Sequence, residues 1–156
     1  MSGTARPYLR PGAVERIFGR ILVLLVRIGL VRGHFYVLEV RGRQSGRTIS
    51  LPVDPIDLDG RCYLVCARGN ANWVRNARAA GRVTLRKGHQ SDDFAVREVG
   101  LAERPELLKA YLDRFALTVQ RYFPIPRGSP ASEFAPIAER YPVFELTPAG
   151  EAPARA

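Results

Sequence analysis

The sequence has few of the side chains that perform most metal and covalent chemistry in proteins. Its 156 residues include two cysteines and two histidines, and no Cys/His group has the spacing of a metal site. Cys62 and Cys66 stand in RCYLVCA, which we interpret as a strand. Four residues of strand span about 13 Å, whereas a disulfide needs Cα atoms within about 7 Å. We therefore expect neither a metal ion nor a disulfide between these cysteines.

Familiar catalytic and nucleotide-binding motifs are also missing. The chain contains no G-x-S-x-G, no P-loop and no G-x-G-x-x-G. The sequence therefore shows no set of catalytic residues for hydrolysis and no ligands for metal chemistry. A bound organic cofactor would remove the need for such residues, because the protein then supplies only binding and orientation.

Long apolar runs are absent as well. The most apolar segment, residues 17–31, is interrupted by Arg20 and Arg27, and a spanning helix needs about 20 apolar residues. Residues 1–16 lack the apolar core and cleavage site of a signal peptide. We therefore expect a cytoplasmic protein. The apolar face of residues 13–31 should cover a core, and a peripheral contact of this segment with a membrane surface is the alternative.

Basic residues, in contrast, are abundant. The chain carries 24 Lys and Arg against 15 Asp and Glu, a formal net charge of +9. This excess favours an anionic partner: a nucleic acid, an acidic membrane surface, or a phosphorylated or carboxylated ligand. No helix-turn-helix, zinc module or RNA-binding aromatic signature accompanies the basic residues, so we expect no nucleic acid.

Hydrophobic periodicity predicts an α+β fold. Helical spacing indicates helices at 13–31, 73–80 and 104–123, with a weaker signal at 133–141. Six segments have the pattern of strands: 34–41, 48–56, 61–67, 82–88, 93–102 and 142–148. Short turns between consecutive strands favour a mostly antiparallel, six-stranded sheet that closes into a small barrel with N-terminal and peripheral helices. We expect one domain over 13–148, with flexible ends at 1–12 and 149–156.

The turn RGRQSGR, residues 41–47, holds three arginines and two glycines between two predicted strands. Glycine lets the backbone approach a ligand closely, and the N–H groups of such a turn can surround an anion. Arginine adds paired hydrogen bonds to phosphate or carboxylate. A solvated hairpin turn explains the same residues equally well.

A second segment, ARGNANWVRN at residues 67–76, forms a loop followed by the start of a short helix. Trp73 offers a flat wall for an aromatic ring, and Asn76 lies one helical turn later on the same face. Backbone amides at a helix start attract anions or a polarised carbonyl. A core tryptophan that anchors the helix is the simpler interpretation of Trp73 alone.

Together the two segments resemble the deazaflavin-dependent nitroreductase family. VRGRQSGRTISLPV, a hairpin turn at Asp59-Gly60 and YLVCARGNANWVRNARAAGRVTLRKG follow in the family's order, and the similarity covers roughly residues 14–100. The resemblance implies a split β-barrel (FMN-binding-like) fold. It also implies an enzyme that uses reduced coenzyme F420, an 8-hydroxy-5-deazaflavin, with FMN as the alternative cofactor.

The resemblance also implies which residues bind the cofactor. The turn would hold the phosphate and polyglutamate tail, and the second segment would hold the deazaflavin ring. The expected tail contacts are Arg41, Arg43, Gln44, Ser45, Gly46 and Arg47, and the expected ring contacts are Ala67, Arg68, Gly69, Trp73 and Asn76. The family commonly has cations where this chain has Gln44 and Ile49, and Arg41 and Arg47 would compensate for them.

The implied reaction is hydride transfer to an electron-poor, hydrophobic small molecule, such as a quinone, an enone or a nitro compound. Tyr122 is the candidate to line the substrate pocket, and Tyr141 is the second candidate. The proton donor is either a tyrosine, with Tyr122 as the catalytic candidate, or water. The alternative function is non-catalytic binding of a flavin, lipid or other hydrophobic ligand on the same barrel. Monomer and homodimer both remain open.

Overall fold

The computed structural model describes residues 12–27 and 35–150. The helices are α1 (Ala13–Arg27), α2 (Asn72–Ala80) and α3 (Arg104–Val119), followed by the 3-10 turns η1 (Gln120–Tyr122), η2 (Ala131–Glu133) and η3 (Ala135–Arg140). None of these helices is long and apolar enough to cross a membrane. Residues 28–31 of the predicted first helix lie outside the described ranges. The predicted flexible ends, 1–12 and 149–156, also lie outside them, except for residues 12, 149 and 150.

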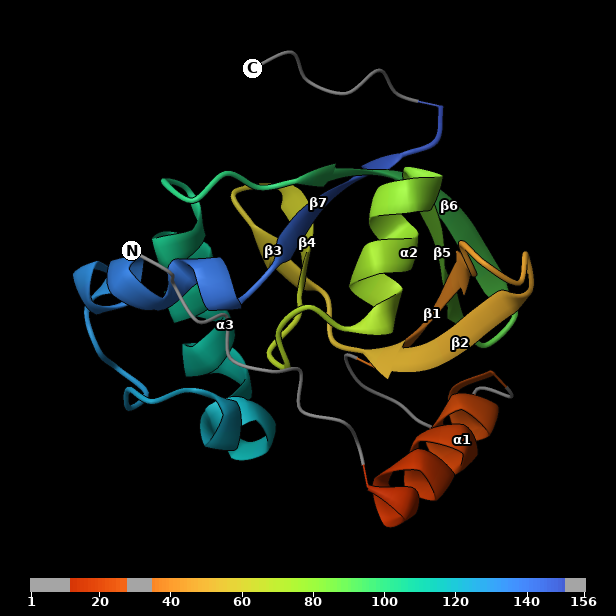
Figure 1. Cartoon of the computed structure of the whole chain (residues 1–156), viewed down its shortest axis with the longest axis horizontal. Coiled ribbons are helices and arrows are strands. Elements are labelled where there is room, and N and C mark those ends of the chain that lie inside the picture. Colours follow the sequence, from red (N-terminus) through yellow and green to blue (C-terminus); the bar gives the residue numbers. More distant parts are fainter. Residues whose placement is uncertain (1–11, 28–34, 151–156) are drawn as a thin grey trace.

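Seven strands form one rolled antiparallel sheet, which confirms the α+β split barrel (Figure 1). The strands are β1 (Tyr36–Arg41), β2 (Thr48–Val53), β3 (Ile56–Leu58), β4 (Arg61–Val65), β5 (Arg82–Lys87), β6 (Gln90–Glu98) and β7 (Val143–Pro148). Their order is β2-β1-β5-β6-β7-β4-β3. The prediction of six strands is wrong by one, because the predicted strand 48–56 is interrupted at Asp54 and Pro55, and Ile56 begins a separate strand, β3.

The short link between β2 and β3 explains why the sheet rolls. These strands lie at the two opposite edges, yet only Asp54 and Pro55 separate them in the chain. Three residue steps reach at most about 11 Å, whereas the outer strands of a flat seven-stranded sheet would lie about 29 Å apart. The sheet must therefore curl until its edges approach each other.

Helix α2 lies against the concave side of the rolled sheet (Figure 1). Its buried side chains include Trp73, Val74 and Ala77, and the Trp73 ring packs 5.8 Å from that of Phe144. The helix ends at Gly81, whose backbone is left-handed (φ 69°) and whose N–H donates to the Ala77 carbonyl. Since a helix of nine residues is marginal in isolation, this packing stabilises it.

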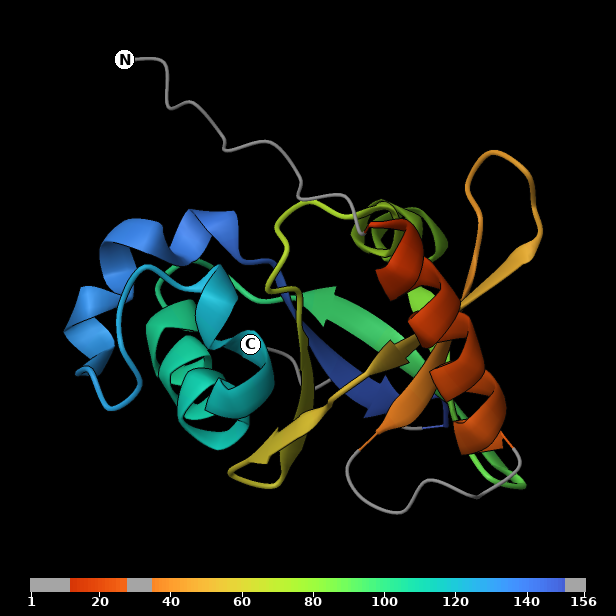
Figure 2. The ribbon, with the colours of Figure 1, turned by 90° about the horizontal axis from the view of Figure 1, so that it is seen from below.

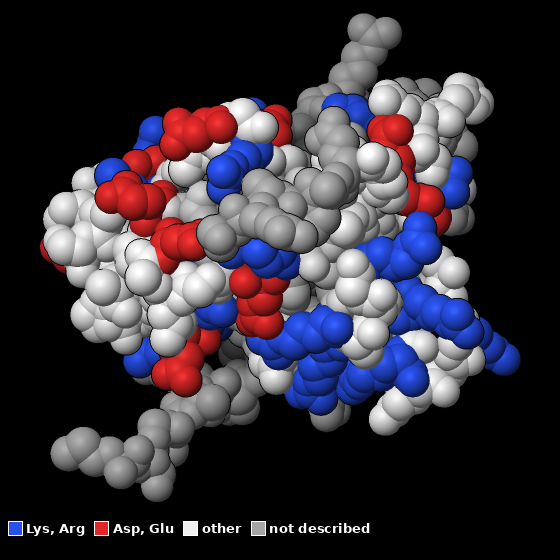
Figure 3. Space-filling view, turned by 90° about the horizontal axis from the view of Figure 1, so that it is seen from above, with Lys and Arg blue, Asp and Glu red and all other residues white. Residues whose placement is uncertain are grey.

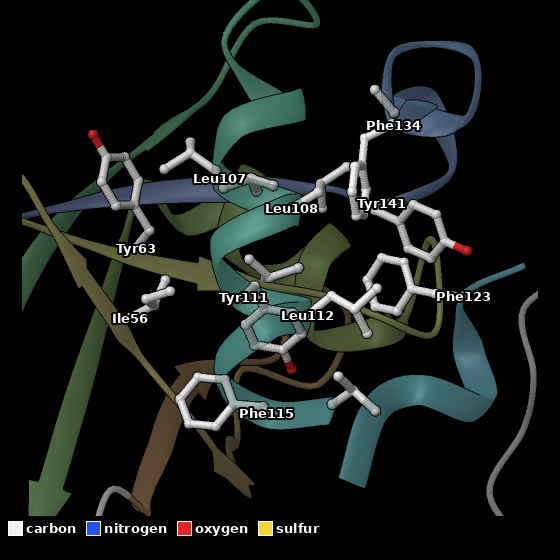
Figure 4. Close-up of a cluster of buried hydrophobic side chains, with 14 of the residues drawn as sticks. Ile56, Tyr63, Leu107, Leu108, Tyr111, Leu112, Phe115, Phe123, Phe134 and Tyr141 are labelled. Atoms are coloured by element: carbon white, nitrogen blue, oxygen red, sulfur yellow. The ribbon is translucent and has the colours of Figure 1, made fainter. Parts of the chain in front are cut away.

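Helix α3 and the 3-10 turns build a second core at the β4 end of the sheet (Figures 2 and 4). The helix buries an apolar stripe whose five side chains lie at helical spacing: Leu108, Tyr111, Leu112, Phe115 and Val119. Phe123 and Tyr141 stack at 4.5 Å beside it. The predicted helix 104–123 is thus α3 continued by η1.

Helix α1 packs beside β2 at the other end of the molecule (Figure 2). The prediction that its apolar face covers a core is wrong. The large apolar side chains on that face are 51–80% exposed, and they are Val14, Ile17, Phe18, Ile21 and Leu24. The half-buried positions are Glu15, Gly19, Leu22, Val23 and Leu25. The helix therefore rests on the body mainly through a different face.

A buried arginine joins α3 to two other segments. Arg104 is 7% exposed, and its guanidinium donates to the carbonyl of Val99 at 2.9 Å and to that of Ala138 at 3.2 Å. A third bond reaches Glu98 at 3.2 Å. Glu98 also accepts two hydrogen bonds from Arg78 of α2, at 2.6 and 2.7 Å. This cluster holds α2, the end of β6 and α3 together.

Replacing Arg104 with alanine should lower the free energy of unfolding by about 3 kcal/mol, because it leaves buried carbonyl groups without donors. Urea denaturation measures the change. Arg82 pairs with Asp93 at 3.7 Å on the surface, so Arg82→Ala is the control and should cost under about 1 kcal/mol. Equal effects of the two substitutions would contradict a special role for the buried cluster.

Candidate functional site

The basic turn joins β1 to β2 and is held by its own backbone. The Gly42 N–H donates to the Arg47 carbonyl at 2.8 Å, and the Gly46 N–H donates to the Gly42 carbonyl at 2.9 Å. Gly46 has a φ of 69°, which disfavours other residues there. The Ser45 hydroxyl accepts from the Arg47 N–H at 3.2 Å. Ser45 thus helps to shape the turn.

A single side chain connects this turn to helix α2. The Asn76 amide oxygen accepts hydrogen bonds from the Arg43 backbone N–H at 3.2 Å and from the Arg43 guanidinium at 2.8 Å. Asn76 is 2% exposed, so leaving its amide oxygen without a donor would be costly, whereas Arg43 itself is exposed. The structure therefore gives Asn76 a role that its sequence position did not indicate, which is to position Arg43.

Other cations of the turn face solvent. Arg41 and Arg47 are exposed and have no acidic partner within the described ranges. Gln44 and Ile49 are exposed as well, and neither supplies a charge. The largest group of Lys and Arg side chains in Figure 3 lies over the half of the molecule that carries α2 and the β1–β2 hairpin. The turn therefore offers an uncompensated positive charge to an anion.

A cavity of about 820 Å³ lies between α1, β2, the loop after β4 and the end of α3. Four of the residues expected at the cofactor and substrate sites line it: Ala67, Arg68, Trp73 and Tyr122. The other expected residues do not, namely those of the turn with Gly69, Asn76 and Tyr141. Its volume is within the range of about 300–1,000 Å³ that small-molecule sites occupy.

Two arginines enclose the ring of Tyr122 at the edge of this cavity. The guanidinium carbon of Arg68 lies 5.1 Å from the ring centre, and that of Arg121 lies 4.8 Å from it. Both guanidiniums also pair with the Glu15 carboxylate of α1 at 3.4 Å. Glu15 further accepts from the Gly12 N–H at 3.1 Å, as a residue in the first helical turn can. These contacts attach the start of α1 to the rim of the cavity.

The remaining candidate groups have simpler roles. Tyr141 is 4% exposed, and its hydroxyl donates to the Tyr122 carbonyl at 2.7 Å, so it supports Tyr122 from the core. Tyr111 lines the cavity, and burial raises the pKa of its hydroxyl. Burial likewise raises the pKa of the Cys66 thiol, which argues against a thiolate nucleophile. Within the described ranges, no three His, Cys, Asp or Glu side chains gather as a metal site.

Sequence reasoning did not single out several residues of this site. Glu15, Arg121 and Tyr111 all line the cavity, but none of them belongs to a motif that marks it in the sequence. The only local signal was the position of Glu15 in the first turn of a helix. Its two arginine partners are far away in the sequence, so no spacing pattern could reveal them.

Comparison with known proteins decides what kind of site this is. A family model described as F420H2-dependent quinone reductase matches residues 26–122. The chain belongs to this family. Coenzyme F420 is therefore the cofactor of this F420H2-dependent reductase, and the resemblance to deazaflavin-dependent nitroreductases is confirmed. No curated protein matches the chain.

Solved structures agree with this fold. Protein Atu2129 of Agrobacterium tumefaciens, of unknown function, aligns with a TM-score of 0.56 at 16% identity, over 91% of this chain and 58% of its own. A structure described as a domain-swapped dimer gives 0.53 at 17% identity, over 86% and 96% of the two chains. A NimC/NimA family protein of Clostridium acetobutylicum gives 0.50 at 11% identity, over 83% and 82%.

The residues present fit the cofactor of the quinone reductase family. A deazaflavin ring needs an apolar cavity with a flat wall, and Trp73 lies in a cavity of suitable size. A phosphate and polyglutamate tail needs cations without acidic partners, and the described neighbours of Arg41 and Arg47 provide no such partner.

The attachment of α1 through Glu15 should depend on pH. The Gly12 N–H bond and then the Arg68 guanidinium hold the pKa of the Glu15 carboxyl below its ordinary value. A lowered pKa means that the attachment is fully present above the ordinary glutamate pKa of about 4.3. It should be lost as the pH falls through the lower, folded-state value.

Fluorescence of Trp73, the only tryptophan, reports this change because Trp73 lines the cavity beside α1. The emission of the wild type should shift to longer wavelength in acid before global unfolding. Glu15→Gln should show the shifted emission already at neutral pH and no separate acid step. Identical titrations of the two proteins would contradict the attachment.

Proposed function

We propose that F420 binds with its ring in the cavity and its anionic tail on the basic turn. The observation that carries this proposal is the pair of hydrogen bonds between Asn76 and Arg43. Asn76 stands on α2, the helix that also brings Trp73 to the cavity. One rigid helix therefore fixes the position of the turn relative to the cavity. An apolar ring joined to a phosphate and carboxylate tail matches that arrangement.

Within this arrangement, the residues of the turn contribute differently to binding of the cofactor tail. Arg43 is held in place by Asn76 and retains further N–H donors for a tail phosphate. Arg41 and Arg47 add long-range attraction from exposed positions. Gln44 contributes hydrogen bonds but no charge. Arg41 and Arg47 supply the cationic character that Gln44 and Ile49 do not.

We further propose a quinone as the acceptor, within the wider class of electron-poor compounds. F420H2 supplies a hydride when bound. The acceptor must take up that hydride and one proton to become a hydroquinone. The protein holds both molecules in a cavity with apolar walls, where α1 limits the access of water.

Tyr122 is the proposed proton donor. Its ring lines the cavity between Arg68 and Arg121, which restrict its rotation. The same guanidiniums would stabilise negative charge that develops on an acceptor oxygen nearby. The Tyr141 hydroxyl fixes the Tyr122 backbone from the other side. These contacts hold the Tyr122 ring at the cavity, where its hydroxyl would donate the proton to a bound acceptor.

Arg43→Ala should weaken F420 binding by about 1.5–3 kcal/mol, the scale of a charge-assisted hydrogen bond. Asn76→Ala should also weaken binding, because it frees Arg43 from its position. Fluorescence titration with F420 measures both affinities. Arg82→Ala removes an exposed arginine outside the turn and should leave the affinity unchanged. An unchanged affinity of Arg43→Ala would reject the proposed tail contact.

Tyr122→Phe retains the ring between the two arginines and removes only the hydroxyl. Loss of a general acid should lower kcat for quinone reduction about 100-fold, without a change in F420 affinity. Oxidation of F420H2 followed by absorbance gives the rate, and Tyr36→Phe, outside the cavity, is the matched control. A wild-type kcat in Tyr122→Phe would assign the proton to water instead.

A further inference from the structure

Helix α1 carries an apolar stripe that points away from the described body of the protein. Its members recur at helical spacing and are 51–80% exposed: Val14, Ile17, Phe18, Ile21 and Leu24. Scattered apolar side chains on a surface are ordinary, but five of them on one face of one helix are not. The stripe therefore indicates a surface with a partner.

The stripe is available while α1 stays attached to the body. The helix rests on β2 through half-buried positions such as Leu22 and Val23, which lie outside the stripe. Glu15 pairs with Arg68 and Arg121 on the rim of the cavity. Partner binding therefore does not require the helix to come loose, and the body presents the stripe on a fixed support.

We propose that this stripe docks the protein on an anionic lipid surface. Arg20 is exposed beside the stripe, and it has no acidic partner among the residues that the structure describes. The whole chain carries a formal charge of +9, which attracts the protein to negative headgroups. A helix with apolar side chains on one face and arginines beside them lies in the interface plane of a bilayer.

A second copy of the chain fits the stripe less well. A two-fold contact would place the same face of both copies together, so the Arg20 side chains of the two copies would approach each other without acidic partners. The five apolar side chains expose on the order of 500 Å², less than the ~800 Å² that each partner buries in a typical stable interface.

The stripe also continues into the cavity. Val14 and Phe18 belong to both the stripe and the cavity lining. When α1 lies on a bilayer, the mouth of the cavity therefore opens towards its apolar phase. An apolar acceptor dissolved in the bilayer would then enter beside Phe18 without crossing water. This consequence rests on the proposed function, whereas the docking itself does not.

Vesicle sedimentation tests the docking. The wild type should sediment with phosphatidylcholine vesicles that contain phosphatidylglycerol, and binding should weaken in high salt or with phosphatidylcholine alone. The double variant Ile17→Gln/Ile21→Gln should lose binding by about tenfold or more. Neither residue lines the cavity, so F420 binding should persist and verifies the fold. Leu117, fully exposed on α3, provides the matched control Leu117→Gln, which should bind vesicles like the wild type.

Three results would overturn the proposal. The wild type could stay in the supernatant with anionic vesicles, or the double variant could sediment as well as the wild type. Analytical ultracentrifugation could instead show a wild-type dimer that the double variant abolishes, which would assign the stripe to a second copy. Quinone reduction gives a separate readout: the double variant should lose activity on a bilayer-embedded quinone and keep it on a water-soluble one. Failure of F420 binding in the wild type would reject the proposed function without affecting the vesicle result.

Discussion

The short connection between β2 and β3 constrains everything else in this structure. Because Asp54 and Pro55 alone link the two edge strands, the sheet has to curl, and its concave side has to be filled. Helix α2 fills it, with Trp73 packed on Phe144. The cavity then lies where the curled sheet, α1 and the end of α3 meet. The cavity is thus a consequence of the way the barrel closes.

Polar bonds between distant segments turn that cavity into a site. Asn76 fixes the basic turn to α2, and Glu15 fixes α1 to Arg68 and Arg121. Both bonds join elements that the backbone alone would leave independent. In the binding mode that we propose, they would have separate tasks. The Asn76–Arg43 bonds would set the distance from the cofactor ring to its tail, and the Glu15 ion pairs would close one side of the cavity.

Helix α1 shows that a correctly predicted amphipathic helix does not reveal what its apolar face contacts. Its spacing predicts an amphipathic helix, which is what the structure contains. An amphipathic pattern states that one face avoids water, but it does not state whether protein or lipid provides the cover. Here Val14, Ile17 and their neighbours face outwards. The stripe of α3, with the same kind of spacing, is buried by the second core.

The sequence by itself determined the fold class, the family and the two segments that we propose to bind the cofactor, because these depend on local patterns and on motif order. Pairings across the fold depended on tertiary structure. Arg43 meets Asn76 33 residues away, and Arg68 meets Glu15 53 residues away. No local spacing encodes such contacts, since the curl of the sheet brings the segments together. For the same reason, only the folded chain separates Tyr122, which lines the cavity, from Tyr141, which supports it from the core.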